Sequence, residues 1–102
     1  MKIRFARTAQ ISLHEAIDHI RQDNPIAARH FLQKVERTIR RLERYPNSGR
    51  RIPEFPDLPY RELPVPPYRF FYRVEPKTIF IVAVWHDAQI PMEPEKTKVK
   101  GA

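Results

Sequence analysis

The sequence contains no cysteine and only two glycines, Gly49 and Gly101. Without cysteine, the chain can form neither a disulfide framework nor a cysteine-ligated zinc site. Two isolated glycines exclude the glycine-rich loops that bind the phosphates of nucleotides. Long apolar runs are also missing, because Lys2, Arg4 and Arg7 interrupt the amino-terminal segment, so neither a signal peptide nor a membrane span is predicted. These absences predict a cytoplasmic protein.

The length and charge of the chain favour one small basic domain. A chain of 102 residues, with 41% hydrophobic and 30% charged side chains, is long enough for one core. The 19 lysines and arginines exceed the 12 aspartates and glutamates, which gives a net charge of +7. Such a charge favours a polyanionic partner, either nucleic acid or an acidic protein segment, without choosing between them.

The first half of the chain is predicted to form a strand and two helices. Residues 2–6 alternate between polar and apolar side chains, as a short strand does. Apolar residues recur at helical spacing over residues 8–22, with Thr8 as the expected N-cap. A cap and a first-turn proline at Asn24–Pro25 start a second helix, which ends at Tyr45–Pro46. The short break predicts an antiparallel helical hairpin.

The second half is predicted to form three strands. It is rich in proline, since six of the eleven prolines lie within Pro53–Pro67. Residues 60–65 are expected at a sheet edge, because Pro64 cannot donate a ladder hydrogen bond. Residues 68–74 are aromatic, and residues 78–85 are apolar without alternation, which is typical of a central strand covered on both faces.

These elements predict an α+β fold of order β-α-α-β-β-β, in which the two-helix hairpin packs on a small antiparallel-dominated sheet. The strand at residues 2–6 is expected beside the strand at residues 78–85. The predicted domain covers residues 1–89. Residues 90–102 combine two prolines with alternating charges and are expected to be a flexible tail.

Arginines gather on the second helix and on the predicted sheet. On the helix, the simplest interpretation is a solvated outer face with Glu36 and Arg40 as an ordinary i,i+4 pair. In the strand at residues 68–74, Arg69 and Arg73 share one face, opposite the aromatic side chains that suit the helices. Both are therefore expected on an open face, where Arg61 and His86 are predicted to join them.

An open face with arginines, a carboxylate and a histidine has the groups needed to bind or cleave RNA. Cleavage removes a proton from the 2′-hydroxyl, stabilises the phosphorane charge and protonates the 5′ oxygen. Arginine suits the phosphorane, while Glu54 or His86 suits the proton transfers. The alternative is that Arg61–Glu62 and Arg73–Glu75 are ordinary surface ion pairs and that His86 merely ends a strand. No metal-ligand motif is present, and no cofactor is expected.

Five segments together resemble the RelE/ParE superfamily, toxins of bacterial type II toxin–antitoxin modules that are also labelled plasmid stabilisation proteins. Their order and spacing carry the resemblance through residue 89. They are Asp23-Asn-Pro-Ile-Ala-Ala-Arg, Leu42-Glu-Arg-Tyr-Pro-Asn-Ser-Gly-Arg-Arg, Arg61-Glu-Leu-Pro-Val, Tyr68-Arg-Phe-Phe-Tyr-Arg-Val and Val82-Ala-Val-Trp-His86.

The resemblance implies a growth-inhibiting toxin restrained by a cognate antitoxin. In the RelE-like branch, which cuts mRNA on the ribosome, the matching positions are Glu54 as general base, Arg61 and Arg69 as phosphate contacts, and His86 as acid. The sequence is interpreted first as such an endonuclease. The ParE-like branch instead poisons DNA gyrase without catalysis and also has a histidine here. A non-toxic basic RNA-binding domain is the third possibility.

Arg50, Arg51 and Arg73 are predicted to contact nucleic acid, the first two standing in for the lysines of the nuclease branch. The antitoxin is expected to contribute an acidic or amphipathic segment that folds on binding, in a salt-dependent complex with no membrane involved.

Overall fold

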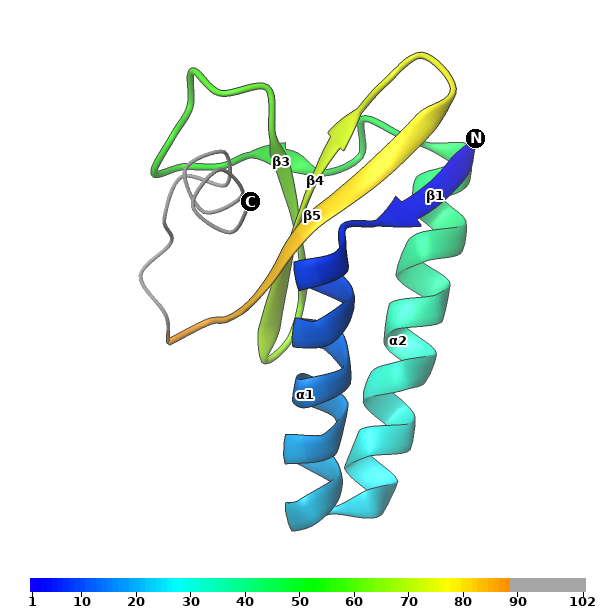
Figure 1. Ribbon diagram of the computed structural model, residues 1–102, viewed down its shortest axis with the longest axis vertical. Coiled ribbons are helices and arrows are strands. Elements are labelled where there is room, and N and C mark those ends of the chain that lie inside the picture. Colours follow the sequence, from blue (N-terminus) through cyan, green and yellow to red (C-terminus); the bar gives the residue numbers. More distant parts are fainter. Residues whose placement is uncertain (89–102) are drawn as a thin grey trace.

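The computed structural model describes residues 1–88, in which a pair of helices packs on one face of a five-stranded sheet (Figure 1). The elements are β1 (Lys2–Phe5), α1 (Arg7–Asp23), α2 (Pro25–Arg44), β2 (Arg50–Arg51), β3 (Arg61–Val65), β4 (Tyr68–Val74) and β5 (Thr78–His86). The order across the sheet is β1-β5-β4-β3-β2, where β1 runs parallel to β5 and every other pair is antiparallel. The predicted α+β architecture is confirmed, but the strand expected at the sheet edge, β3, is flanked by the short β2, which was not predicted. The expected tail at 90–102 lies outside the described residues.

The two helices begin in different ways. Asn24 caps α2 as predicted, because its side-chain oxygen accepts hydrogen bonds from the amides of Ile26 and Ala27, both at 3.1 Å. The prediction that Thr8 caps α1 is wrong, since α1 begins at Arg7 without a side-chain cap. The amide of Ala6 instead donates to the carbonyl of Ile81 in β5 at 2.9 Å, which fixes the chain to the sheet where the helix starts.

The main core lies between the helices and the sheet. The predicted alternation of β4 is confirmed, because Tyr68, Phe70 and Tyr72 face the helices. On the helices, small residues of α1 and larger residues of α2 meet this face. The buried members on the helices are Ala9, Ala16, Phe31, Val35 and Leu42.

A bulge in β5 changes which side chains face the helices. Phe71 pairs with Ala83 and Tyr72 pairs with Ile81, so Val82 has no partner in β4. Past this point the alternation of β5 is inverted, and Val84 joins Ile81 in the helix-side core. The bulge also explains why the apolar run of residues 78–85 does not alternate.

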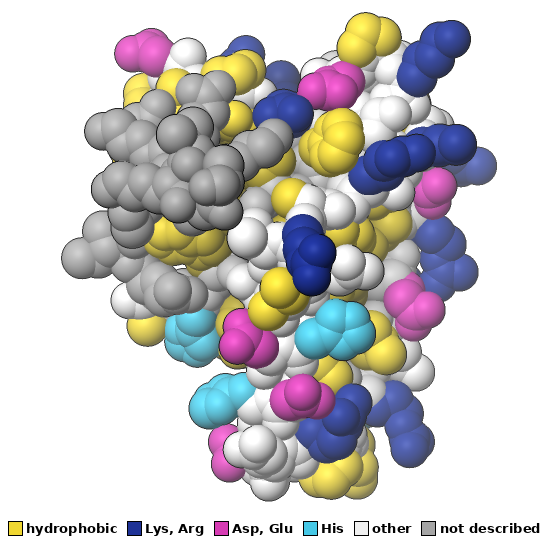
Figure 2. Space-filling model, in the orientation of Figure 1, with side chains coloured by type: hydrophobic (Ala, Val, Ile, Leu, Met, Phe, Trp, Pro, Cys, Tyr) yellow, Lys and Arg dark blue, Asp and Glu magenta, His cyan; other side chains and the backbone are white. Residues whose placement is uncertain are grey.

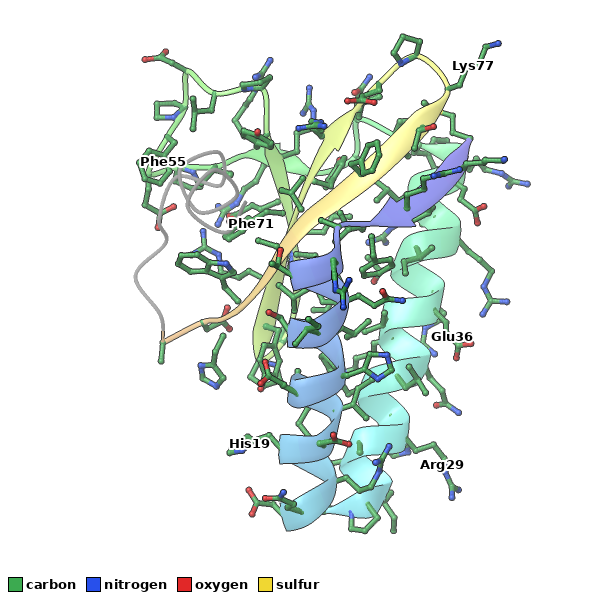
Figure 3. The ribbon with its side chains drawn as sticks, in the orientation of Figure 1. His19, Arg29, Glu36, Phe55, Phe71 and Lys77 are labelled. Atoms are coloured by element: carbon green, nitrogen blue, oxygen red, sulfur yellow. The ribbon has the colours of Figure 1, made fainter. Side chains whose placement is uncertain are left out.

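A second, smaller core covers part of the opposite face. Ile52 and Tyr60, at the two ends of the loop between β2 and β3, are buried against Phe71 and Ala83. Figure 3 shows this loop, which carries Phe55, on the side of the sheet away from the helices. The prediction of an open face is therefore wrong in part, since Phe71 is only 1% exposed. The reason is that the proline-rich loop carries apolar side chains, and they are buried by packing against this face of the sheet.

The Tyr72→Phe variant is expected to lower the free energy of unfolding by about 1–3 kcal/mol. The buried Tyr72 hydroxyl donates to the carbonyl of Pro46 at 2.8 Å and accepts from the amide of Gly49 at 2.9 Å. Phenylalanine leaves both backbone groups without this partner. Urea unfolding checks the loss, and equal stability of variant and wild type would contradict it.

Tyr72 should also make the fold sensitive to alkali. Burial raises the pKa of its phenol above the ordinary value of 10.0, so the folded state favours the protonated form. This contribution to stability is complete below pH 10.0 and is lost as the pH rises through the higher folded value. Unfolding measured from pH 8 to 12 should show a smaller alkaline loss in Tyr72→Phe than in the wild type.

Candidate functional site

A buried glutamate on β3 organises the charged face of the sheet. Glu62 is 1% exposed, and one carboxylate oxygen accepts a hydrogen bond from the Nε of Arg50 at 2.7 Å. Its other oxygen accepts from Nε of Arg69 at 2.9 Å and also from Nη2 of Arg69. Strand register causes this convergence, because Glu62 lies opposite Arg50 on β2 and Arg69 lies on the neighbouring strand β4. We call Arg50, Glu54, Glu62 and Arg69 the arginine–glutamate cluster.

Glu54 closes the outer side of this cluster. Its carboxylate is 41% exposed and lies 3.2 Å from Nη2 of Arg69. Burial acts to raise the pKa of Glu54, but the hydrogen bond from Arg69, a backbone hydrogen bond and the charges of Arg69 and Arg50 outweigh it, and the pKa is lowered. A carboxylate held in its ionised form is a weaker base at neutral pH.

Arg69 is held within the cluster. Its side chain is 14% exposed, it lies over the ring of Phe71 at 5.2 Å, and its Nε and Nη2 contact Glu62 or Glu54. Desolvation acts to lower the pKa of Arg69, yet the hydrogen bonds and charges of Glu62 and Glu54 raise it overall. Arg50, with a side chain 68% exposed, is therefore the more accessible cation of the cluster.

Two further arginines are held by neighbouring groups. Arg73 donates from Nε to Glu75 at 2.9 Å and lies 5.3 Å over the ring of Phe80, so the Arg73–Glu75 ion pair considered above is present. Arg51 donates to the carbonyl of Leu58 at 2.8 Å, in the loop that covers the second core.

Arg61 does not join these side chains, and that prediction is wrong. It pairs with Tyr72, which faces the helices, and opposite residues of an antiparallel pair point to the same face. Its guanidinium donates to the carbonyl of Gly49 at 2.8 Å. Neighbouring positions on β3 thus place Arg61 and Glu62 on opposite faces, and the Arg61–Glu62 pair considered above is not formed.

His86 also lies away from the cluster, contrary to the prediction. It pairs with Tyr68, and the two rings meet edge to face with centroids 5.2 Å apart. Together with His19 of α1, it lines a hollow of about 590 Å³ on the helix side. The bulge at Val82 is the cause, because uninterrupted alternation from Ile79 would put His86 on the face of Arg69.

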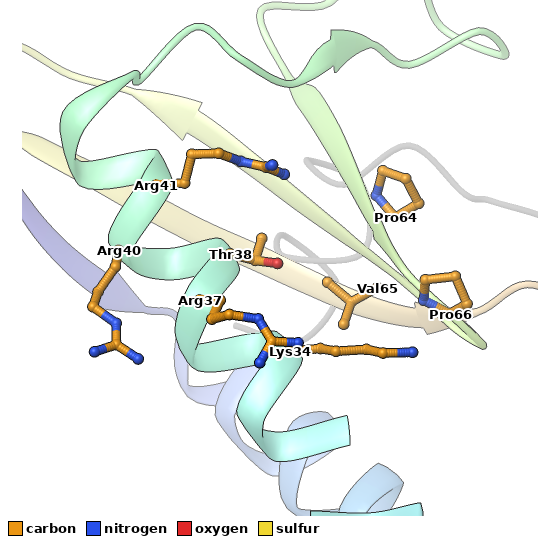
Figure 4. A pocket seen from close by; sticks show the side chains of 8 residues that line it. All are labelled: Lys34, Arg37, Thr38, Arg40, Arg41, Pro64, Val65 and Pro66. Carbon is orange, nitrogen blue, oxygen red and sulfur yellow. The ribbon is translucent and has the colours of Figure 1, made fainter. Parts of the chain in front are cut away.

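The outer face of α2 carries cations without the expected acidic partner. Within residues 1–88, no ion pair joins Glu36 to Arg40, so the predicted i,i+4 pair is not formed. Figure 2 shows basic side chains gathered along one edge of this view. Between α2 and the end of β3, Lys34, Arg37, Arg40 and Arg41 line a hollow of about 510 Å³ (Figure 4).

Neither a metal-ligand cluster nor a membrane-spanning helix is found within residues 1–88. In residues 1–88, no group of three or more histidine, aspartate or glutamate side chains is arranged to hold a metal ion. None of the described helices combines the length and apolar character that crossing a bilayer requires.

Comparison with known proteins identifies the family. No curated protein matches the chain. A solved structure, described as the chromosomal ParDE TA system from P. aeruginosa, shares the fold with a TM-score of 0.66 at 22% identity, and the match covers 84% of this chain and 95% of that one. A family model described as the ParE toxin of the type II toxin–antitoxin system parDE matches residues 3–91. The chain therefore belongs to the ParE toxin family and is the toxin of a type II toxin–antitoxin system, with an antitoxin as its partner.

Proposed function

We propose that this toxin inhibits growth by binding DNA gyrase and catalyses no reaction itself. The observation that carries the proposal is the separation of the four candidate catalytic side chains. Glu54 and Arg69 lie on the sheet face away from the helices, whereas Arg61 and His86 belong to the opposite face. The base and the acid that cleave a phosphodiester must flank one phosphate, and this arrangement does not provide that geometry.

The chemistry of the cluster also supports binding over catalysis. The lowered pKa of Glu54 opposes its use as a general base. Arg69 is engaged with two carboxylates through Nε and Nη2, so their charges offset its own, and Nη1 is left for a phosphate. For these reasons we do not carry forward the mRNA endonuclease that the sequence first favoured.

Three arginines of the sheet are the proposed contacts with the target. Arg50 extends from the arginine–glutamate cluster with most of its side chain exposed. Arg73 lies on the same face of β4 as Arg69, and Arg51 follows Arg50 on the edge strand β2, where its register partner is Arg61. Both add positive charge to the sheet. A basic surface of this kind suits an enzyme–DNA complex, because the DNA phosphates attract it. Gyrase acts on the chromosome, so the proposal keeps the predicted cytoplasmic location.

Tightly controlled expression of the wild-type chain tests this function. We expect gyrase-linked chromosome breaks with intact transcripts, and co-expression of the antitoxin should prevent them. Arg50→Ala should reduce the breaks at least roughly tenfold, whereas Lys77→Ala, an exposed cation in the turn after β4, is the matched control and should not. Transcripts cut at defined sites, with intact chromosomes and with cutting lost in Glu54→Gln or His86→Ala, would establish the endonuclease instead.

A further inference from the structure

A groove follows α2 where the helix faces β3 and the turn after it. It consists of the hollow of about 510 Å³ already described and a second hollow of about 400 Å³. Both are lined by Lys34 and Pro66, so they adjoin and form one groove. The second hollow is otherwise lined by Ile20, Ala27, His30, Phe31 and Pro67.

One end of this groove is positively charged. In Figure 4, Lys34, Arg37 and Arg41 extend from α2 on the side of Pro64 and Pro66. These three cations follow one another at spacings of three and four residues, at which like charges on a helix repel. No acidic side chain within residues 1–88 forms an ion pair with any of them, in contrast to the arginines of the arginine–glutamate cluster.

The other end of the groove is apolar. Ala27, Phe31, Pro66 and Pro67 supply its lining, and His30 lies beside them. The adjoining edge of β3 is only partly covered, because β2 pairs with Arg61 and Glu62 alone. A nucleic-acid backbone carries charge along its whole length and gains little from such an apolar end, whereas an amphipathic peptide fits both ends.

We propose that this groove binds a segment of the antitoxin that has apolar side chains at one end and carboxylates at the other. The apolar end would lie against Ala27 and Pro67, and the carboxylates would contact Arg37 and Arg41. From Ala27 to Arg41, α2 rises about 21 Å, which matches about 14 residues of helix or six to seven extended residues. The proposal rests on family membership and is independent of the gyrase target.

Two double variants of equal charge test the charged end. Arg37→Glu/Arg41→Glu should weaken binding to the cognate antitoxin roughly 100-fold by calorimetry. The matched control is Arg44→Glu/Lys77→Glu, which should change the affinity less than about threefold. Arg41 and Arg44 both lie in the last turn of α2, so the two variants disturb the helix end alike, but only Arg41 lines the groove. Equal weakening by both would overturn the proposal.

The contributions of the charged end and the apolar end to antitoxin binding can be measured separately, the first by varying salt and the second by substituting an apolar residue. The wild-type affinity should fall as salt rises from 0.1 to 0.5 M, and Arg37→Glu/Arg41→Glu should flatten that dependence. Ala27→Trp should block the apolar end and weaken binding roughly tenfold with the salt dependence retained. Gln33→Trp, on an exposed part of α2, is the control and should bind normally. Unchanged affinity in Ala27→Trp would remove the apolar end from the site.

Further controls distinguish loss of antitoxin binding from loss of folding and from loss of target binding. If Arg37→Glu/Arg41→Glu unfolds at a lower temperature than the wild type, Arg37→Ala/Arg41→Ala provides a milder variant. It should also bind the antitoxin more weakly than the wild type. Both variants should still inhibit growth when the antitoxin is absent. The calorimetric test measures only binding to the antitoxin, so its outcome does not depend on whether gyrase is the target. If the variants bind the antitoxin normally but lose binding to a 20-base-pair DNA duplex, the groove is a nucleic-acid site and the proposal is wrong.

Discussion

Replacing Glu62 by alanine should lower the free energy of unfolding by about 3 kcal/mol. Glu62 is fully buried, and its two carboxylate oxygens bind the guanidiniums of Arg50 and Arg69. Arg50 can turn into water, but Arg69 is mostly buried and would keep only the exposed carboxylate of Glu54. Urea unfolding of the purified toxin measures the loss.

Two further variants show whether this loss comes from the buried charge. Glu54→Ala removes a carboxylate that also contacts Arg69 but is well exposed, so it should cost less than about 1 kcal/mol. Glu62→Met/Arg69→Met removes both buried charges and should be more stable than Glu62→Ala. If Glu62→Ala proves no less stable than Glu54→Ala, the cluster does not stabilise the fold as argued.

Replacing Gly49 by alanine is the second change with a large expected effect, about 3 kcal/mol of lost stability. An added Cβ would lie 2.6 Å from Cε1 and from the hydroxyl of Tyr72, and 2.7 Å from the carbonyl oxygen of Glu62. Tyr72 is held by hydrogen bonds to Pro46 and Gly49, and the carbonyl belongs to β3, so neither can move cheaply. Thermal unfolding followed by circular dichroism measures the effect.

The cause at Gly49 is steric, because no residue within 1–88 has a positive φ. Asn47→Ala in the same loop is the control and should change stability by less than about 0.5 kcal/mol. Combining Gly49→Ala with Tyr72→Ala should cost less than the sum of the two single changes, since the second makes room for the first. Strict additivity of the two changes would contradict the proposed clash.

Local sequence patterns were sufficient to predict the main elements. Helical spacing predicted residues 8–22, where α1 is Arg7–Asp23, and strand patterns predicted 68–74, which is β4. Asn24 was predicted correctly as a cap because capping depends on residues two and three positions away. The strand β2 was not predicted, since two arginines carry no strand pattern and pair only through contact with β3.

The candidate site was harder to predict because it depends on register and on the bulge. Simple alternation placed Arg69 correctly but could not show that Arg61 lies opposite Tyr72 or that Val82 inverts the end of β5. Glu62 was considered only as a surface partner of Arg61. Strand alternation could have indicated that Glu62 faces away from Arg61 and Leu63. Its burial, however, follows from contacts with segments far away in the sequence.

DNA supercoiling by purified gyrase is the most direct test of the central claim, that the toxin acts by binding and not by cleavage. Stoichiometric wild-type toxin should block supercoiling, the antitoxin should restore it, and Glu54→Gln should inhibit as well as the wild type. Messenger RNA on programmed ribosomes should stay intact in the same preparation. Normal supercoiling together with mRNA cleavage that depends on Glu54 would contradict the account.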